Sequence, residues 1–228
     1  MERKGISQEQ LKLIACITML LDHIGLVFFP GSFLRIIGRL SFPIYCYLLS
    51  EGVCHTRNRC RYGCRLLICT VLAEIPFDLV CYGAWNWGKQ SVMVTLFLGY
   101  LFCVGANQIP DFSGRVLLLM PFIWLGELLR GDYGGWGIMI IGMFFLTRNL
   151  PQSRLLQMVC LGAVSLVMSK SKVSVGDFVI PLQVFAVAAM VPICLHDGRK
   201  RVSTKWIQWG FYLFYPVHLL ALYFIGRL

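Results

Sequence analysis

Long apolar runs follow one another along almost the whole of this 228-residue chain, and they restrict its possible folds more than any other feature. Runs of about 17 to 25 apolar residues are long enough to cross a bilayer as α-helices. Because 57% of the residues are hydrophobic, 14% are charged and the mean hydropathy is +0.70, little sequence remains for a water-soluble domain. We therefore expect an all-α fold, an integral membrane helical bundle that forms a single domain over residues 1–228.

Polar residues and Gly or Pro breaks divide the chain into about nine such runs, with eight or ten as the alternatives. The first run is too long, and too closely followed by further runs, for a cleaved signal peptide, so we expect it to be a permanent span. The fifth to seventh runs are short, and each could be tilted, interfacial or merged with a neighbour. The expected spans are Leu11–Phe29, Phe33–Val53, Leu66–Gly83, Val92–Ala106, Val116–Leu129, Tyr133–Leu146, Leu155–Ser169, Phe178–Leu195 and Trp206–Gly226.

The placement of Lys and Arg predicts the orientation of these spans, because cytoplasmic connections carry an excess of cations. With nine spans, one set of connections holds thirteen cations and the other holds five. This asymmetry predicts a multi-pass protein of the cytoplasmic (inner) membrane with its N-terminus in the cytoplasm. We therefore interpret the net charge of +10 as a signal for membrane orientation rather than for nucleic-acid binding. The larger set is Arg3, Lys4, Arg57, Arg59, Arg61, Arg65, Arg115, Arg148, Arg154, Arg199, Lys200, Arg201 and Lys205; the smaller is Lys89, Arg130, Lys170, Lys172 and Arg227.

The ten cysteines are scattered, most of them inside apolar runs, where cysteine behaves as a small hydrophobic residue. No pair of them has the spacing of metal ligands, so we expect no metal.

Lys12 and His23 are the first candidates for a functional site. They are eleven residues apart in the first span, almost three helical turns, so both side chains fall on one face, about 16 Å apart along the axis. A cation near the inner surface can hold phosphate, and a neutral imidazole deeper in the span can accept a proton. The alternative is a lysine that reaches the interface and a histidine that serves packing.

Ionisable residues within other spans form two further pairs, each one helical turn apart. Arg35 and Arg39 lie in the second span, and Glu74 and Asp78 in the third. Charges in a span cost about 3 kcal/mol each on insertion scales, so they need partners or a function. Pairing between these arginines and carboxylates is the structural interpretation, and it is compatible with a polar cavity. Asp22 points about 100° away from its neighbour His23 and is expected to serve a different helix.

The connection after the second span is strongly basic. Arg57, Arg61 and Arg65 recur every four residues, which in a helix makes one basic stripe. Such a stripe can meet anionic lipid or bind the phosphates of a soluble cofactor. His55 follows Glu51 by four residues and could be held by that carboxylate.

Several of these segments together resemble the TraX family of multi-span membrane proteins. The segments are LLDHIG, IGRLSFPIYCYLLSEG, HTRNRCRYGCRLL, AEIPFDLVCYG, DYGGWG and FYPVHLL, in this order. The match is densest from Leu20 to Gly83. TraX proteins are associated with N-terminal acetylation of pilin subunits, so the resemblance implies acyl transfer. The family is also similar to membrane acyltransferases whose first span carries a basic residue, ten intervening residues and a catalytic histidine, the spacing of Lys12 and His23.

We therefore expect a membrane acyltransferase that transfers an acyl group from acyl-CoA, in particular acetyl-CoA, to an acceptor protein or glycan. The coenzyme-binding set is Lys12, Arg57, Arg61, Arg65 and His55; the catalytic set is His23 as general base with Asp22, Arg35, Arg39, Glu74 and Asp78. Two other classes stay open. A transporter or proton-coupled permease would use the buried Asp, His, Glu and Arg side chains as a relay, and an assembly factor would use them only to hold spans together.

Overall fold

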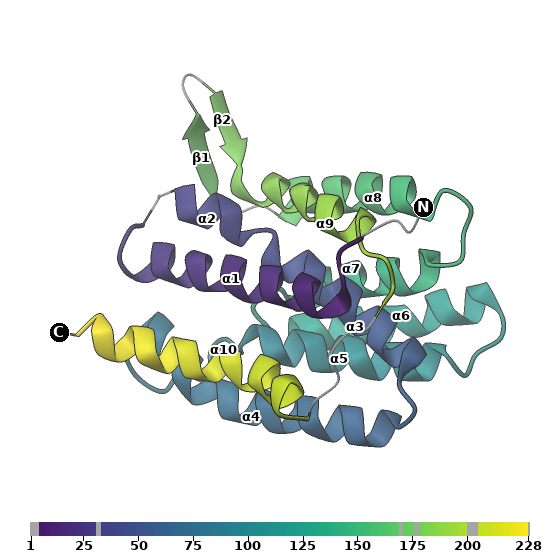
Figure 1. The fold of residues 1–228 in the computed structure, drawn as a ribbon, viewed down its shortest axis with the longest axis horizontal. Helices are drawn as coiled ribbons and strands as arrows, with labels where there is room; N and C mark the ends of the chain where they lie inside the picture. The colour runs from purple at the N-terminus through teal and green to yellow at the C-terminus, as the bar shows by residue number, and fades with distance from the viewer. Residues whose placement is uncertain (1–4, 31–32, 169–170, 176–177, 200–204, 228) are drawn as a thin grey trace. The chain divides into compact units, whose positions relative to one another are not determined.

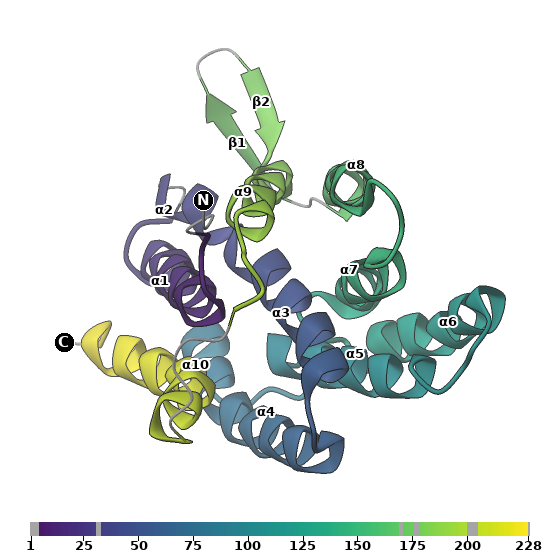
Figure 2. The same ribbon diagram turned by 45° about the vertical axis from the view of Figure 1, so that its right-hand side comes forward.

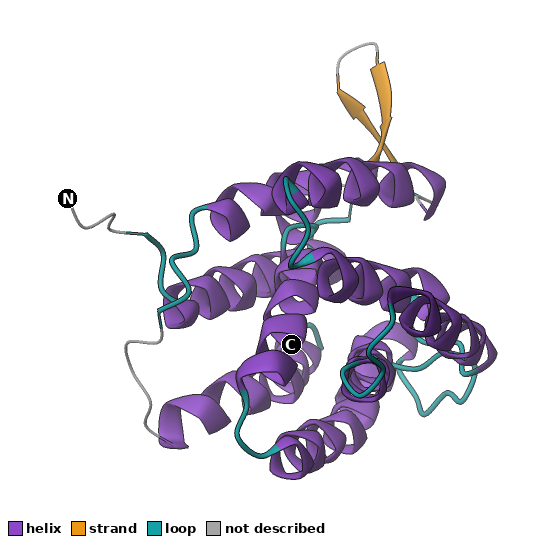
Figure 3. Cartoon of the chain, turned by 90° about the vertical axis from the view of Figure 1, so that its right-hand side faces the viewer, coloured by secondary structure: helices purple, strands orange, loops and turns teal. Residues whose placement is uncertain are grey.

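The computed structural model describes residues 5–30, 33–168, 171–175, 178–199 and 205–227, and these are predominantly helical (Figure 3). The exception among them is a two-stranded antiparallel hairpin, in which Lys172 pairs with Pro181 and Val175 with Phe178. The elements are α1 (Gln8–Val27), α2 (Phe33–Gly38), α3 (Ser41–His55), α4 (Arg59–Tyr82), α5 (Val92–Ala106), α6 (Phe112–Leu128), α7 (Gly134–Thr147), α8 (Ser153–Met168), β1 (Lys172–Val175), β2 (Phe178–Pro181), the 3-10 helix η1 (Leu182–Ala189), α9 (Met190–Cys194) and α10 (Lys205–Ile225).

Each of the nine apolar runs contains a helix, which confirms the helical prediction. The second run is divided after Gly38, and α3 starts at Ser41. Pro43 thereby falls in the first turn of α3, where its missing N–H costs no helical hydrogen bond. The eighth run opens as strand β2 before it becomes helical.

The number of membrane spans is a separate matter from the number of helices. Two segments of the described chain, Gln8–Val27 and Phe33–His55, are both long and apolar enough to cross a bilayer. Val92–Ala106, Gly134–Thr147, Ser153–Met168 and Leu182–Cys194 are apolar but shorter. Nine crossings therefore remain a prediction, as does the orientation. The cations Arg3, Lys4, Lys170, Lys200 and Arg201, on which that prediction partly depends, lie outside the described residues.

The chain divides into two compact units, each assembled from separate stretches of sequence. Unit 1 comprises Met1–Tyr45 and Pro151–Phe211, and unit 2 comprises Cys46–Leu150 and Tyr212–Leu228. Helices α3 and α10 each continue from one unit into the other.

Unit 1 is built around the pairing of α1 with α2 and of α8 with η1 (Figures 1 and 2). Ser7 and Gln10 form a reciprocal capping box at the start of α1, which satisfies two backbone N–H groups that a helix end would otherwise leave unpaired. Leu11, Ala15, Leu161 and Ile193 are completely buried in its core. The hairpin β1–β2 projects beyond α8 and α9 (Figure 1).

Unit 2 packs α4, α6 and α7 against α5. Its core is aromatic and aliphatic: the ring of Phe102 lies edge-on to that of Phe145 at 6.0 Å, and both side chains are buried. At Gly99 an added Cβ would lie 2.2 Å from Ile141 Cδ1, so α5 and α7 approach closely because this position has no side chain.

Several helices present apolar faces that the described chain does not cover. On α4 the exposed side chains recur at the spacing of one helical face, and α6 and α8 carry similar faces. Apolar patches of this extent are uncommon on water-soluble monomers and are typical of surfaces that meet lipid or another protein. The exposed residues are Leu67, Ile68, Val71, Leu72 and Ile75 on α4, Leu117, Met120, Trp124 and Leu128 on α6, and Leu155, Val159, Leu166 and Val167 on α8.

Candidate functional site

Lys12 and His23 lie on one uninterrupted helix, α1, as the sequence predicts. The eleven-residue interval therefore spans about three helical turns. The two side chains lie about 16 Å apart along the axis and on a shared face. Lys12 Nζ lies 5.5 Å from the centre of the Phe211 ring, a cation–π contact within unit 1. The aromatic partner orients the ammonium without neutralising its charge.

A backbone contact determines which nitrogen of His23 carries the lone pair. His23 Nδ1 lies 2.9 Å from the carbonyl oxygen of Met19, one turn earlier. A carbonyl oxygen only accepts hydrogen bonds, so Nδ1 carries the proton and the lone pair of the neutral ring is on Nε2. The half-buried imidazole is thus held in the tautomer whose Nε2 carries the lone pair.

Asp22 binds both arginines of α2 and of the turn that follows it. Arg35 Nη1 donates to Asp22 Oδ2 at 2.9 Å, and Arg39 Nη2 donates to Asp22 Oδ1. The side chains of Asp22, Arg35 and Arg39 are 14%, 20% and 13% exposed. Two guanidinium groups thus share one carboxylate, and the trio carries a net positive charge centred on the residue that precedes His23 in the sequence. The prediction that Asp22 serves another helix is confirmed.

Two residues that sequence reasoning missed complete this cluster. Gly38 allows the close approach of α2 to α1, because a Cβ built there would lie 2.3 Å from Cβ and from Oδ1 of Asp22. Gln183, on η1, lies far away in the sequence, and its Oε1 is 3.5 Å from Arg39 Nη1. Gly38 lies within the IGRLSFP motif and could have been suspected from it, whereas no local pattern indicates Gln183.

Glu74 and Asp78 have other partners than the arginines that the sequence pattern favours for them. Glu74 Oε1 accepts a hydrogen bond from Ser91 Oγ at 2.6 Å, and the backbone N–H of Ser91 also donates to this carboxylate. Asp78 is 4% exposed, and its Oδ2 accepts from the backbone N–H of Asn86 at 3.0 Å. Both carboxylates therefore secure the α4–α5 connection of unit 2. Their expected catalytic role stays a prediction.

The basic stripe is shorter than predicted. Asn58 caps α4 by accepting from the N–H of Arg61, so Arg57 lies before the helix while Arg61 and Arg65 are one turn apart on it. Arg65 lies over the Tyr212 ring, 5.7 Å from its centre, within unit 2. The interruption at Arg57 follows from the capping preference of Asn58, a signal that is visible in the sequence.

His55 is held by Glu51 mainly through the backbone. Its Nδ1 is 2.9 Å from the Glu51 carbonyl oxygen and 3.7 Å from the Glu51 Oε2. The side chain is 77% exposed. A role for His55, Arg57, Arg61 and Arg65 in coenzyme binding remains a prediction, and these residues belong to unit 2 whereas Lys12 and His23 belong to unit 1.

Comparison with known proteins agrees with the resemblance in the sequence. The model of the family described as TraX protein matches residues 7–226. The chain belongs to the TraX family. The match includes every candidate residue of this TraX-family chain, in both units. Among the described residues, no group of three or more His, Cys, Asp or Glu side chains could hold a metal ion.

Two curated relatives cover nearly the whole TraX-family chain. The "Probable fimbrial assembly protein FimC, serogroup H1" of Dichelobacter nodosus is 29% identical over 232 residues, which is 93% of this chain and 93% of that protein. The "Uncharacterized protein RP591" of Rickettsia prowazekii (strain Madrid E) is 25% identical over 246 residues, 98% of this chain and 94% of that protein. No solved structure matches the chain.

Proposed function

We propose that this TraX-family chain is a multi-pass membrane acyltransferase that moves an acyl group, first of all acetyl, from coenzyme A to an amine or hydroxyl of a protein or cell-surface acceptor. The observation that carries the proposal is the geometry of α1. One helix presents a cation, Lys12, and three turns further a histidine, His23, whose Nε2 is the basic nitrogen of the neutral ring. Membership of the TraX family and a relative named for fimbrial assembly support an acceptor of the pilin class.

In the proposed reaction, His23 Nε2 takes the proton from the acceptor amine or hydroxyl as its nitrogen or oxygen attacks the thioester carbon. The new bond joins the acceptor to the acyl carbon, the carbon–sulfur bond breaks, and coenzyme A leaves as a thiolate that takes up a proton. Lys12 binds a phosphate of the coenzyme at the other end of the face.

The Asp22–Arg35–Arg39 cluster supplies positive charge where the reaction develops negative charge. The oxyanion of the tetrahedral intermediate and the leaving thiolate are both stabilised by a guanidinium in a water-poor site. Asp22 holds both arginines from two directions, so their positions are set before substrate binds. Asp22 is therefore a positioning residue in this proposal, and Arg35 and Arg39 are the electrostatic catalysts.

The experiment is transfer of labelled acetyl from acetyl-CoA to purified acceptors by the reconstituted chain. His23→Ala is expected to lower transfer by about 100-fold or more while coenzyme binding persists, because general-base catalysis contributes factors of this size. Lys12→Ala is expected to raise KM for acetyl-CoA with less effect on kcat.

The matched control is His196→Asn. His196 also belongs to unit 1 and its Nδ1 also bonds a backbone carbonyl, that of Ile6, at 2.9 Å. Equal transfer by the wild type, His23→Ala and Lys12→Ala would overturn the proposal. A pH-dependent flux across vesicles without any coenzyme requirement would favour the permease instead.

A further inference from the structure

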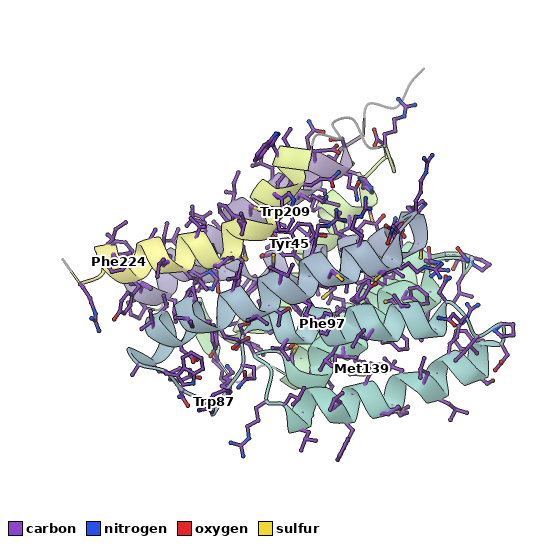
Figure 4. The ribbon with its side chains drawn as sticks, turned by 90° about the horizontal axis from the view of Figure 1, so that it is seen from below. Tyr45, Trp87, Phe97, Met139, Trp209 and Phe224 are labelled. Carbon is purple, nitrogen blue, oxygen red and sulfur yellow. The ribbon has the colours of Figure 1, made fainter. Side chains whose placement is uncertain are left out.

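The connection between α4 and α5 carries an exposed aromatic pair. Its sequence is GAWNWGKQS, residues 83–91. The side chains of Trp85 and Trp87 are 55% and 77% exposed, with their ring centres 5.2 Å apart in an edge-to-face arrangement. Figure 4 shows Trp87 on this connection, outside the helices of unit 2. Tryptophan combines a large apolar ring with a polar N–H, so an exposed pair of this kind is typical of a contact surface or of a membrane interface.

The backbone around the pair is held in place from both sides. The N–H of Asn86 donates to the buried carboxylate of Asp78, and the N–H of Gly88 donates to Asn86 Oδ1 at 2.7 Å. Gln90 Nε2 donates to the carbonyl oxygen of Trp87 at 3.2 Å. The backbone that carries the two indoles is thus held in place, so little backbone freedom remains to be lost on binding.

A second set of contacts ties the connection to the turn after α6. The N–H of Gln90 donates to the carbonyl oxygen of Arg130 at 3.0 Å, and Lys89 forms an ion pair with Asp132. This pair also neutralises Lys89, the one charged residue of the connection. The connection itself is therefore aromatic and has no unpaired charge, which fits a zwitterionic or uncharged partner.

The pair lies at the end of the exposed apolar face of α4. Leu67, Ile68, Val71, Leu72 and Ile75 form this face, and the exposed ring of Tyr82 follows it near the end of the helix. Glu74 and Asp78, the carboxylates of α4, bond the connection itself instead of lying on the apolar face. From the start of α4 to its end and the connection that follows, the side chains are thus first basic, then apolar and finally aromatic.

This order is the pattern of a helix that crosses a bilayer, with tryptophan and tyrosine at one interface and cations at the other. A helix of 24 residues is about 36 Å long, which exceeds the thickness of about 30 Å of the hydrocarbon core. Its Arg, Glu and Asp residues keep α4 out of the two segments that are apolar enough by composition, so its crossing is inferred from its length and from this order of side chains. Because the aromatic surface continues the exposed apolar face of α4, lipid is the partner that fits both surfaces.

We propose that Trp85 and Trp87 bind the headgroup region of a phospholipid bilayer and fix the depth of α4 at the interface opposite the Arg57–Arg65 end. This inference rests on the membrane placement in the proposed function, but not on acyl transfer. Because the connection has no unpaired charge, the contribution of the two indoles does not depend on anionic lipid or on salt, in contrast to a polybasic contact.

The test is depth-dependent quenching of tryptophan fluorescence in phosphatidylcholine vesicles that contain the full chain and nitroxide-labelled lipid. The contribution of the pair is the difference between the wild type and the Trp85→Phe, Trp87→Phe double variant, which keeps aromatic rings at both positions. We expect this difference signal to be quenched at least twofold more by a label near the headgroup than by one near the chain end. Adding anionic lipid or salt should leave it unchanged.

A matched control moves the tryptophan along α4. Val71→Trp in the double-variant background adds an indole to the middle of the exposed face, about 16 Å from Tyr82 along the helix. Its added fluorescence should be quenched more by the deep label than by the shallow one.

The outcomes separate the two proposals. Quenching of the Trp85–Trp87 signal by aqueous iodide but by neither lipid label, with Val71→Trp quenched normally, would overturn the anchor and favour a soluble ligand or a second protein. Absence of lipid quenching for the Val71→Trp indole would overturn the membrane placement of α4 itself.

Discussion

Individual side chains in unit 1 are positioned by backbone groups as much as by one another. His23 Nδ1 bonds the Met19 carbonyl one turn earlier, and Asp22, the neighbour of His23 in sequence, binds two arginines. The imidazole and the carboxylate therefore serve separate purposes although they are adjacent. The consequence can be tested by changing the carboxylate without touching the histidine.

Asp22→Asn removes the charge that holds Arg35 and Arg39 together. We expect the free energy of unfolding to fall by about 1 to 3 kcal/mol, which lies between the values for exposed and for fully buried ion pairs because these side chains are partly exposed. Thermal unfolding in detergent measures this loss, and kcat should fall while His23 remains in place. Combining Asp22→Asn with Arg39→Gln forms a double-mutant cycle, and strictly additive losses would contradict the pairing.

At the scale of elements, the contact between α1 and α2 depends on the absence of a side chain at Gly38. A Cβ there would overlap Asp22, so α2 would have to shift and carry Arg35 and Arg39 with it. In unit 2, the α4–α5 connection and the turn after α6 are fastened by Gln90 and by the Lys89–Asp132 pair. For each of these contacts we predict how its loss changes the stability of the chain.

Gly38→Ala should destabilise the chain by about 1 to 3 kcal/mol, the usual cost of overpacking, and should lower acyl transfer in parallel. The comparison is Gly210→Ala on α10, where an added Cβ has no neighbour within 4 Å. That change should be neutral or stabilising by up to about 1 kcal/mol, because alanine favours helix over glycine. Unfolding temperatures of the two variants decide the matter, and equal effects would refute the role of Gly38.

The contribution of the Lys89–Asp132 ion pair to stability should depend on pH. Burial alone lowers the pKa of Lys89, but attraction and hydrogen bonding to the Asp132 carboxylate outweigh it, so the pKa is raised above 10.5. A raised lysine pKa stabilises the fold below the unfolded value, and this contribution is lost as pH rises through the folded value. Lys89→Met should therefore cost about 0.5 kcal/mol near neutral pH, a small amount because the pair is exposed, and nothing well above pH 10.5. Scanning calorimetry at both pH values checks this, and a deficit that persists in alkali would contradict it.

At the scale of the whole molecule, the exposed apolar faces fit a membrane-associated chain. The uneven distribution of Lys and Arg predicts an inner-membrane protein with its N-terminus in the cytoplasm. Helix α4 offers a direct test, because Cys60 near its start and Cys81 near its end are both exposed. The two residues are 21 positions apart, about 31 Å along a helix.

Single-cysteine variants that retain only Cys60 or only Cys81 should react with a membrane-impermeant maleimide from opposite sides. Cys60 should label only after the cytoplasmic side is opened, and Cys81 in intact cells stripped of their outer membrane. Labelling of both residues from the same side would show that α4 does not cross, and reversed sides would invert the predicted orientation.

Much of this could be derived from the sequence because it depends on neighbours along the chain. Apolar runs predict where helices form, and the eleven-residue interval predicts that Lys12 and His23 share a face, since helical periodicity is a local property. The family was likewise recognisable from several short polar segments taken together, and the family match over residues 7–226 confirms it. The break at Arg57, though missed, also follows from a local signal, the cap at Asn58.

Only the tertiary structure decided which charges meet. Arg35 and Arg39 could satisfy any buried carboxylate, and the choice of Asp22 over Glu74 and Asp78 depends on the packing of α2 against α1 at Gly38. The contact of Arg39 with Gln183 and that of Glu74 with Ser91 likewise join positions that no periodicity relates. The sequence by itself therefore determined the helices and the residues that each helix displays, whereas the partners of its buried charges depend on distances between helices, which no single stretch of sequence encodes.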